Sequence, residues 1–264
     1  MKILCRLTKT MLALAFMAAM FLPCGAEAGR LEDIAARGTI RIGTTGDYIP
    51  MSYLNPKTGE YEGIDAELSQ IIADSLGVKI EYVPTSWPTL TADTMAGKFD
   101  IALCGISRNY ARARTMAMSD AYGEGMFGKT ILCRSKDANK YKTLEDIDKP
   151  EVRVMINPGG TNEKFARANL KRVKLIVHSE NADIPRQVAE GNADIMITET
   201  VEAAQFIRKD PRLAAPMIDA PFTRHSCGIL MQKGDQEWLN YINFVLAELR
   251  MDGTMARLEA KYLK

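Results

Sequence analysis

Histidine and cysteine are scarce in this sequence. The 264 residues include two histidines, His178 and His225, and five cysteines. Metal centres and redox sites usually place several such side chains at short, regular spacings, and the spacings found here match none of those patterns. The sequence therefore predicts no metal site, and it assigns the cysteines a structural role.

An excess of charge of either sign is absent too. The formal net charge is +1 at pH 7, with 25% charged and 47% hydrophobic residues. Proteins that bind nucleic acids usually carry a clustered basic surface, which a nearly neutral chain does not favour. We therefore expect a globular protein with a sizeable core and no nucleic acid partner.

Long apolar runs are missing except near the start. Lys2, Arg6 and Lys9 precede an apolar stretch at 11–22, which leads to Ala26-Glu27-Ala28. A basic head, a short apolar stretch and an A-x-A ending are typical of a secretory signal peptide. Spanning a bilayer takes about 20 apolar residues, so a retained anchor is the weaker interpretation. We expect residues 1–28 to be removed, leaving a periplasmic protein without a membrane span.

Cys24 leaves a lipoprotein as an alternative. The preceding Phe21-Leu22-Pro23 lacks the small residues that lipid-modifying enzymes usually accept, which ranks this alternative second. Removal of the first 28 residues would leave Cys104, Cys133 and Cys227. Because three cysteines cannot all pair within one chain, at least one thiol should stay free.

The first part of the mature chain alternates strands and helices. A short helix is predicted at 30–38 and a strand at 39–44, where apolar residues alternate. A helix follows at 64–76, with apolar residues at helical spacing and Gly77 at its end, and then a strand at 79–83. Strand, helix and strand in this order form the unit from which parallel sheets are built.

One local pattern occurs twice. Residues 95–102 and 189–196 share a helix end, a glycine, an aspartate and a short apolar strand, and each strand leads into a polar loop. The carboxyl edges of parallel strands are where open α/β sheets bind ligands. The repeat therefore predicts two lobes that each present a loop to a common cleft, although any α/β protein could show such a pattern.

These observations predict a two-lobed α/β protein with a ligand cleft between the lobes. We expect lobe 1 to comprise residues 29–133 and 228–264, and lobe 2 to comprise residues 134–227. The segment 238–263 has the periodicity of a helix and should pack back on lobe 1.

The loop at 157–163 is a candidate anion site. Pro158, Gly159 and Gly160 expose the backbone where a helix begins, and Thr161 adds a hydroxyl. Free amides at a helix N-terminus attract anions. The loop does not have the P-loop sequence, and a plain helix cap remains the alternative.

Arg112 and Trp87 are candidates for ligand contacts. Arg112 lies five residues beyond Ser107, where its guanidinium could bind a carboxylate through two hydrogen bonds. Arg108 and Arg114 compete for this role. Trp87 follows a predicted strand and forms either a flat wall of the pocket or part of the core.

Glu199 and Glu202 follow the apolar strand 193–197 and fall in the first turn of the next helix. A carboxylate at that place is ordinarily ionised, because the helix N-terminus lowers its pKa. Acting as a general acid would require apolar surroundings strong enough to reverse that effect.

Three segments resemble family 3 periplasmic solute-binding proteins, the amino acid receptors of ABC transporters. They read RIGTTGDYIPMSY, GEYEGIDAELSQIIADSLG and FDIALCGISRNYARAR. The resemblance covers essentially the whole mature chain. It implies a type II periplasmic binding-protein fold and, in a receptor, an ABC permease as partner.

Within that family, PTSWPTL and INPGGTNEKFARANLK resemble the cyclohexadienyl dehydratases, enzymes built on the receptor fold. The later TETVEA is similar to their T-D-x-x-E-A, which places the proposed proton donor on Glu202. Glu199 departs from the aspartate of that pattern, at the position where transport proteins usually hold the amine of the ligand. The extra methylene leaves the preference between prephenate and arogenate open.

The resemblance implies a role for each candidate residue. Arg112 and Thr161 would hold a substrate carboxylate, and Glu202 would protonate the departing ring hydroxyl. The cleft would be lined by Tyr48, Trp87, Ser107, Asn157, Gly160 and Glu199. The implied reaction removes water and carbon dioxide from prephenate or arogenate and needs neither cofactor nor metal. A non-catalytic amino acid receptor is the main alternative, and an unrelated lyase or sensor module is a third.

Overall fold

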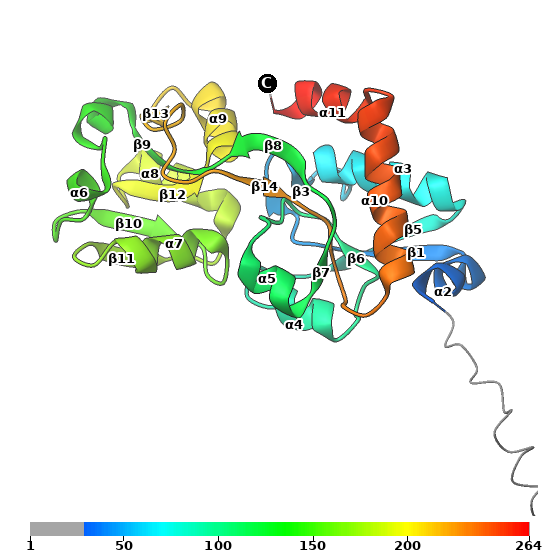
Figure 1. Cartoon of the computed structure of the whole chain (residues 1–264). Coiled ribbons are helices and arrows are strands. Elements are labelled where there is room, and N and C mark those ends of the chain that lie inside the picture. The colour runs from blue at the N-terminus through cyan, green and yellow to red at the C-terminus, as the bar shows by residue number, and fades with distance from the viewer. Residues whose placement is uncertain (1–28, 264) are drawn as a thin grey trace, which may run out of the picture.

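The structure is a computed structural model that describes residues 29–263, with the backbone alone for residues 124–126. The signal peptide expected over residues 1–28 lies outside the described residues. The described chain forms two lobes, each built on its own five-stranded sheet with helices packed against it (Figure 1). The expected two-lobed α/β class is confirmed.

The sheet of the first lobe has the strand order β5-β1-β6-β15-β7. Strand β1 pairs in parallel with β5 and β6, whereas β15 runs antiparallel to β6 and β7. A small second sheet of three strands joins β1 to the first long helix. The strands of this lobe are β1 (Thr39–Thr44), β2 (Asp47–Tyr48), β3 (Ser52–Leu54), β4 (Tyr61–Glu62), β5 (Lys79–Pro84), β6 (Ile101–Ala102), β7 (Ala117–Met118) and β15 (Leu230–Met231).

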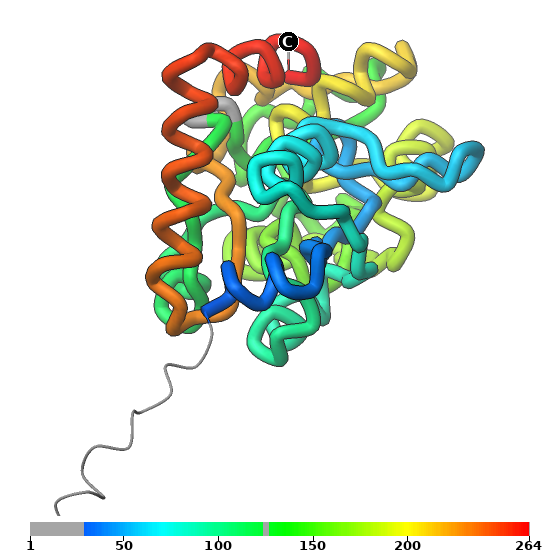
Figure 2. The backbone as a smooth tube through the Cα atoms, turned by 90° about the vertical axis from the view of Figure 1, so that its right-hand side faces the viewer, coloured from blue at the N-terminus to red at the C-terminus, as the bar shows by residue number. Residues whose placement is uncertain are grey.

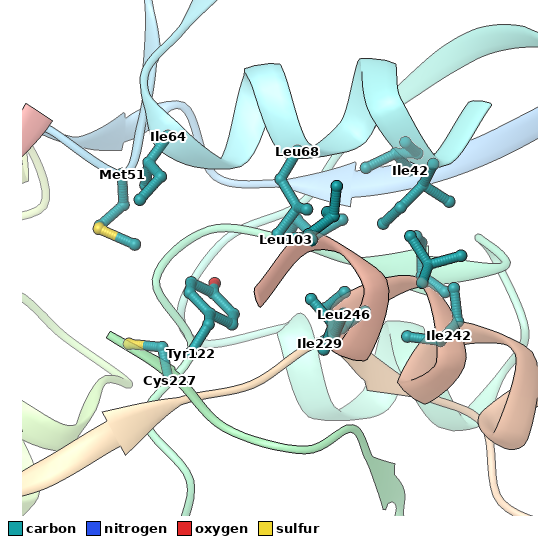
Figure 3. Close-up of a cluster of buried hydrophobic side chains, with 14 of the residues drawn as sticks. Ile42, Met51, Ile64, Leu68, Leu103, Tyr122, Cys227, Ile229, Ile242 and Leu246 are labelled. Atoms are coloured by element: carbon teal, nitrogen blue, oxygen red, sulfur yellow. The ribbon is translucent and has the colours of Figure 1, made fainter. Parts of the chain in front are cut away.

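The helices of the first lobe pack on this sheet and on one another. They are α2 (Arg30–Arg37), α3 (Ile64–Leu76), α4 (Leu90–Met95), α5 (Tyr110–Thr115), α10 (Gln236–Met251) and α11 (Thr254–Tyr262). Ile64 and Leu68 of α3 lie in one buried cluster with Ile242 and Leu246 of α10 (Figure 3). In Figure 2, α10 runs along one side of the molecule, and α2 lies beside its N-terminal end.

The C-terminal segment differs from the single helix expected at 238–263. Helix α10 ends at Met251, and α11 begins at Thr254. Gly253 between them has a φ of 77°, in the left-handed region where a glycine carries no steric penalty. The chain therefore turns, and α11 packs against both α10 and α3.

The sheet of the second lobe has the strand order β11-β10-β12-β9-β13. Its middle strands are apolar on both faces: Val154 and Ile156 face one buried cluster, and Met155 faces another. The elements are β9 (Lys129–Arg134), η2 (Ser135–Lys140), α6 (Leu144–Ile147), β10 (Arg153–Ile156), α7 (Thr161–Asn169), β11 (Lys174–Val177), η3 (Asn181–Asp183), α8 (Ile184–Glu190), β12 (Ile195–Glu199), α9 (Thr200–Lys209) and β13 (Leu213–Ala214).

Two antiparallel strands, β8 (Tyr122–Phe127) and β14 (His225–Cys227), carry the chain between the lobes (Figure 1). Strand β9 follows β8 and pairs with β12 of the second sheet. The lobe boundary expected between residues 133 and 134 thus falls inside β9, and the chain crosses a few residues earlier.

The repeated glycine–aspartate pattern has the same structure in both lobes. Gly97 and Gly191 adopt φ values of 65° and 87° where α4 and α8 end. Asp100 accepts hydrogen bonds from the backbone N–H and guanidinium of Arg41 in β1, and Asp194 does the same with Arg153 in β10. In each lobe the aspartate therefore ties one parallel strand, β1 or β10, to the neighbouring strand that leads to the interlobe pocket.

Candidate functional site

A small cavity lies between the lobes. Residues from the first lobe on its wall are Tyr48, Trp87, Gly105 and Ser107, and residues from the second are Asn157, Gly160, Thr161, Asn162, Asn181, Glu199 and Glu202. Its volume is about 20 Å³, room for roughly one water molecule. The lobes are thus closed on each other, and a ligand larger than a water molecule could enter only if they separate by a hinge motion.

Strand ends position most of these residues. Asn157 follows β10, Glu199 is the last residue of β12, and Ser107 lies in the loop after β6. Because β10 and β12 are parallel, their carboxyl ends meet at one edge of the second sheet, and the edge of the first sheet faces it across the cavity. Of the nine residues predicted for the site, eight line this cavity; Arg112 is the exception.

Glu202 lies in the first turn of α9 and is 1% exposed. Thr198 donates a hydrogen bond to its Oε2, and Asn181 Nδ2 lies 3.4 Å from its Oε1. Burial raises the pKa of Glu202 to about 8, against the lowering effect of Thr198; Asp47 and Glu199 add to the rise. Desolvation thus outweighs the helix N-terminus, and the side chain is protonated at neutral pH.

Glu199 has the opposite electrostatic state. Burial alone would raise its pKa, but Lys129 and then His225 hold the pKa below its ordinary value. Lys129 Nζ contacts Glu199 Oε1, and it also donates to Thr161 Oγ1 at 2.8 Å and to Asn162 Oδ1 at 2.5 Å. Two carboxyl groups three residues apart are therefore held in different protonation states, which is typical of sites that use acid–base chemistry.

Four buried polar atoms of the pocket have no hydrogen-bond partner among the described residues. They are Tyr48 Oη, Asn157 Oδ1, Asn181 Oδ1 and Glu199 Oε2. Leaving such an atom unpaired costs about 1–3 kcal/mol, so native structures seldom keep several of them together. Their concentration in one pocket indicates a site built for a ligand with several polar groups.

Arg112 lies behind the pocket wall. Its Nη1 donates to the Ser107 carbonyl oxygen at 2.7 Å, and burial lowers its pKa. Its position supports the loop that carries Ser107 and adds a positive charge near the cavity. The competing Arg108 and Arg114 are exposed side chains outside the pocket.

Trp87 is a wall of the pocket as well as a core residue. Its Nε1 lies 3.0 and 3.1 Å from the two carboxylate oxygens of Asp47, and burial raises the pKa of Asp47. Asn181 Nδ2 from the second lobe donates to the Asp47 carbonyl oxygen at 3.0 Å. This contact links the two lobes directly beside Glu202.

The loop at 157–163 is both a helix cap and part of the pocket wall. Glu163 Oε2 accepts a hydrogen bond from the Gly159 N–H at 2.6 Å, as a helix cap would. Gly160 and Thr161 nevertheless line the cavity. Gly159, with φ of 81°, approaches the first lobe so closely that a Cβ atom would lie 2.4 Å from Pro88 N.

Sequence reasoning missed Lys129, Asn162 and Asn181 as site residues. Lys129 begins a strand that continues with Thr130 and the apolar residues 131–133, so a single cation at the start of a buried strand was its signal. The pKa values of Cys104 and Cys133 are raised to about 12 by burial, so neither buried thiol is a reactive nucleophile.

Within residues 29–263, no group of three or more His, Cys, Asp and Glu side chains is arranged to hold a metal ion. The same part of the chain contains no helix of the length and hydropathy needed to cross a membrane.

Comparison with known proteins supplies the family. The model for bacterial extracellular solute-binding proteins of family 3 matches residues 40–264. The cyclohexadienyl dehydratase of Pseudomonas aeruginosa is 41% identical over 218 residues, which are 83% of this chain and 80% of the relative.

Two solved structures of ancestral proteins are also similar. An ancestral amino acid-binding protein, described as a precursor of cyclohexadienyl dehydratase, is 36% identical with a TM-score of 0.81 over 89% of this chain and 99% of the other. A variant of an ancestral cyclohexadienyl dehydratase is 51% identical with a TM-score of 0.55 over 89% and 97%. These matches confirm the expected type II periplasmic binding-protein fold.

Proposed function

Because the chain belongs to the bacterial extracellular solute-binding proteins of family 3, we propose that it is a member that has become a cyclohexadienyl dehydratase. It would convert prephenate to phenylpyruvate, and arogenate to phenylalanine, with loss of water and carbon dioxide. Its 41% identity to the Pseudomonas aeruginosa enzyme over 83% of the chain supports this proposal.

The observation that carries the proposal is the protonated Glu202 in the interlobe pocket. Glu202 is 1% exposed and lines the cavity, where it can reach a ligand. A general acid needs such a group, because burial raises its pKa to about 8 and keeps its proton available at neutral pH.

In the proposed reaction, Glu202 protonates the ring hydroxyl, and the C–O bond breaks to release water. The bond between the ring and its carboxylate breaks as well, its electron pair completes the aromatic ring, and carbon dioxide leaves. The Glu202 carboxylate then regains a proton from solvent when the lobes open. Lys129 and Arg112 supply positive charge at and behind the pocket wall, and the Thr161 hydroxyl can donate a hydrogen bond to a substrate carboxylate. The proposed chemistry requires no cofactor and no metal.

A second candidate function is an amino acid receptor for an ABC permease. The unpartnered oxygen of the ionised Glu199 favours it, since such an oxygen could accept a hydrogen bond from a ligand ammonium group. The similarity to an ancestral amino acid-binding protein points the same way.

The dehydratase would act in the periplasm after removal of residues 1–28. Membership in a family of bacterial extracellular proteins supports this, as does the composition of residues 1–28, which is typical of an export signal. N-terminal sequencing of the protein recovered from the periplasm would locate the cleavage site.

The direct test uses purified protein without residues 1–28. It is mixed with prephenate, and phenylpyruvate is followed by its absorbance in alkali. Turnover well above the spontaneous rate is the expected result. No turnover, together with saturable binding of an amino acid, would leave only the receptor.

A further inference from the structure

Glu199 lies between the Lys129 ammonium group and the His225 imidazole. Lys129 Nζ contacts its Oε1, and His225 Nε2 lies 3.4 Å from the same oxygen. The Glu199 and Lys129 side chains are each 5% exposed, and that of His225 is 15% exposed. Water therefore screens this cluster poorly, and its charges act strongly on any ligand in the pocket.

The strand pairing fixes Lys129 in place. Lys129 in β9 lies directly opposite Glu199 in the antiparallel β9–β12 pair. Its ammonium group makes three contacts, with Glu199, Thr161 and Asn162, and all three of these residues line the pocket. Since an ammonium group has three N–H donors, Lys129 cannot turn away from the ligand without losing a bond.

His225 reaches the cluster from the strands that cross between the lobes. It lies in β14 opposite Phe127 of β8, and the two rings are 6.0 Å apart. This packing holds the imidazole close to Glu199, with Nε2 3.4 Å from Glu199 Oε1.

The remaining acids near the pocket do not restore a negative charge for a ligand cation. Glu202 is neutral at pH 7, since its pKa is about 8. Both carboxylate oxygens of Asp47 are engaged by the Trp87 N–H. Arg112 adds a positive charge behind Ser107. A ligand ammonium placed at Glu199 would therefore meet Lys129 on the same carboxylate.

We propose that Lys129, with His225 packed beside it, neutralises Glu199 and thereby makes this pocket select a 2-keto acid over the corresponding 2-amino acid. With the dehydratase function on which the substrate's identity rests, the preferred substrate is then prephenate rather than arogenate. Lys129 sets the greater part of the preference because it contacts Glu199 directly, and His225 contributes the rest.

The test compares phenylpyruvate with phenylalanine, which differ in the keto and ammonium groups. Isothermal titration calorimetry on the purified protein should show phenylpyruvate bound at least tenfold more tightly. Lys129→Met removes the charge at nearly constant volume and should reduce this ratio at least tenfold. His225→Gln should reduce it less. Lys140→Met, which removes an exposed lysine from the same lobe, is the matched control and should leave the ratio unchanged.

Glu199→Gln should change the preference for phenylpyruvate in the opposite direction from Lys129→Met. It leaves Lys129 without its counter-charge, so the preference for phenylpyruvate should increase. Damage to the fold would weaken the binding of both ligands together. It would not change the ratio of the two affinities in opposite directions in Lys129→Met and Glu199→Gln. Equal binding of the two ligands, no saturable binding of either, or a ratio unmoved by Lys129→Met would each overturn the proposal.

Turnover separates this inference from the proposed function. The ratio of kcat/KM for prephenate to that for arogenate should exceed ten and should fall in Lys129→Met. Turnover of both substrates at equal kcat/KM would retain the dehydratase and overturn the selectivity. A preference for phenylpyruvate without turnover of prephenate would retain the selectivity and overturn the dehydratase function.

Discussion

The Thr198 hydroxyl donates a hydrogen bond to Glu202 Oε2 across the junction between β12 and α9. Thr198 is fully buried and Glu202 is 1% exposed, so this bond forms away from solvent. It occupies Oε2 of the carboxyl group, and Asn181 Nδ2 lies 3.4 Å from the other oxygen, Oε1. The strand end thus orients the acid that the proposed reaction needs.

Glu202→Gln should abolish dehydratase turnover and leave the protein folded. Glutamine has nearly the same shape and can still accept from Thr198, but it has no acidic proton. General acid catalysis contributes about 10²–10⁴-fold, so kcat should fall by that factor. Phenylpyruvate formation measures the rate, and far-ultraviolet circular dichroism with thermal melting checks the fold.

The matched control is Glu190→Gln, which changes an exposed carboxylate of the same lobe, paired with Arg186 outside the pocket. Its kcat should equal that of the wild type. Near wild-type kcat in Glu202→Gln would mean that another group donates the proton.

The rate should decline on the alkaline side. Glu202 is active in its protonated form, and its pKa is about 8 because it is buried. Between pH 6 and 7 the acid is mostly protonated, and above pH 8 kcat should fall about tenfold per pH unit. Measuring kcat with saturating prephenate from pH 6 to 10 tests this. A flat profile to pH 10 would exclude Glu202 as the acid that titrates.

The sequence predicted where most of the pocket residues lie because they follow parallel strands. The repeated glycine and aspartate marked the starts of the short strands that lead to Ser107 and Glu199, and the structure brings both residues to one cavity. The rule that ligands bind at the carboxyl ends of parallel strands does not apply to Lys129. It begins the antiparallel strand β9, whose amino end lies at the same edge of the sheet.

Arg112 shows a second limit of what residue spacing can predict. Its five-residue separation from Ser107 placed the two near each other, and they do form a hydrogen bond. Spacing carried no information on which side of the loop the guanidinium would lie. In the closed arrangement it lies behind the pocket wall, so the carboxylate clamp remains a prediction.

Asp65 should make the protein less stable as the pH rises. Its Oδ2 accepts from the Gly105 N–H at 2.5 Å and its Oδ1 from the Tyr122 hydroxyl at 2.9 Å, yet burial raises its pKa to about 7. The folded state keeps a proton that the unfolded chain releases above its ordinary pKa of 3.8. This stabilisation is complete below pH 4 and is lost as the pH rises to 7.

Asp65→Asn removes that titration and retains a side chain that can bond to both Gly105 and Tyr122. The free energy of unfolding in urea should decline less between pH 5 and pH 7 in the variant than in the wild type. The difference between the two declines should be up to about 1.4 kcal/mol per pH unit. Asp74→Asn, at an exposed position on the same helix, serves as the control. A decline identical to that of the wild type would show that Asp65 is already ionised at pH 5.

Gly159→Ala should impair closure of the lobes over the substrate. Gly159 has φ of 81°, and a Cβ atom there would lie 2.4 Å from Pro88 N, 2.5 Å from Pro88 Cα and 2.8 Å from Trp87 C. These are backbone atoms of the other lobe, so rotation of a side chain cannot relieve the overlap. The lobes would have to stay apart, water would enter beside Glu202, and kcat/KM for prephenate should fall at least tenfold.

Gly59→Ala separates this overlap from backbone strain. Gly59 has φ of 73°, but a Cβ atom there would meet no other atom within 4 Å. Both variants should therefore lose comparable stability, about 1 kcal/mol, from an alanine in the left-handed region, while only Gly159→Ala should lose activity. Small-angle X-ray scattering with saturating phenylpyruvate should show a larger radius of gyration for Gly159→Ala than for Gly59→Ala. Equal activity in the two variants would mean that turnover does not require the lobes to approach as closely as Gly159 and Pro88 do here.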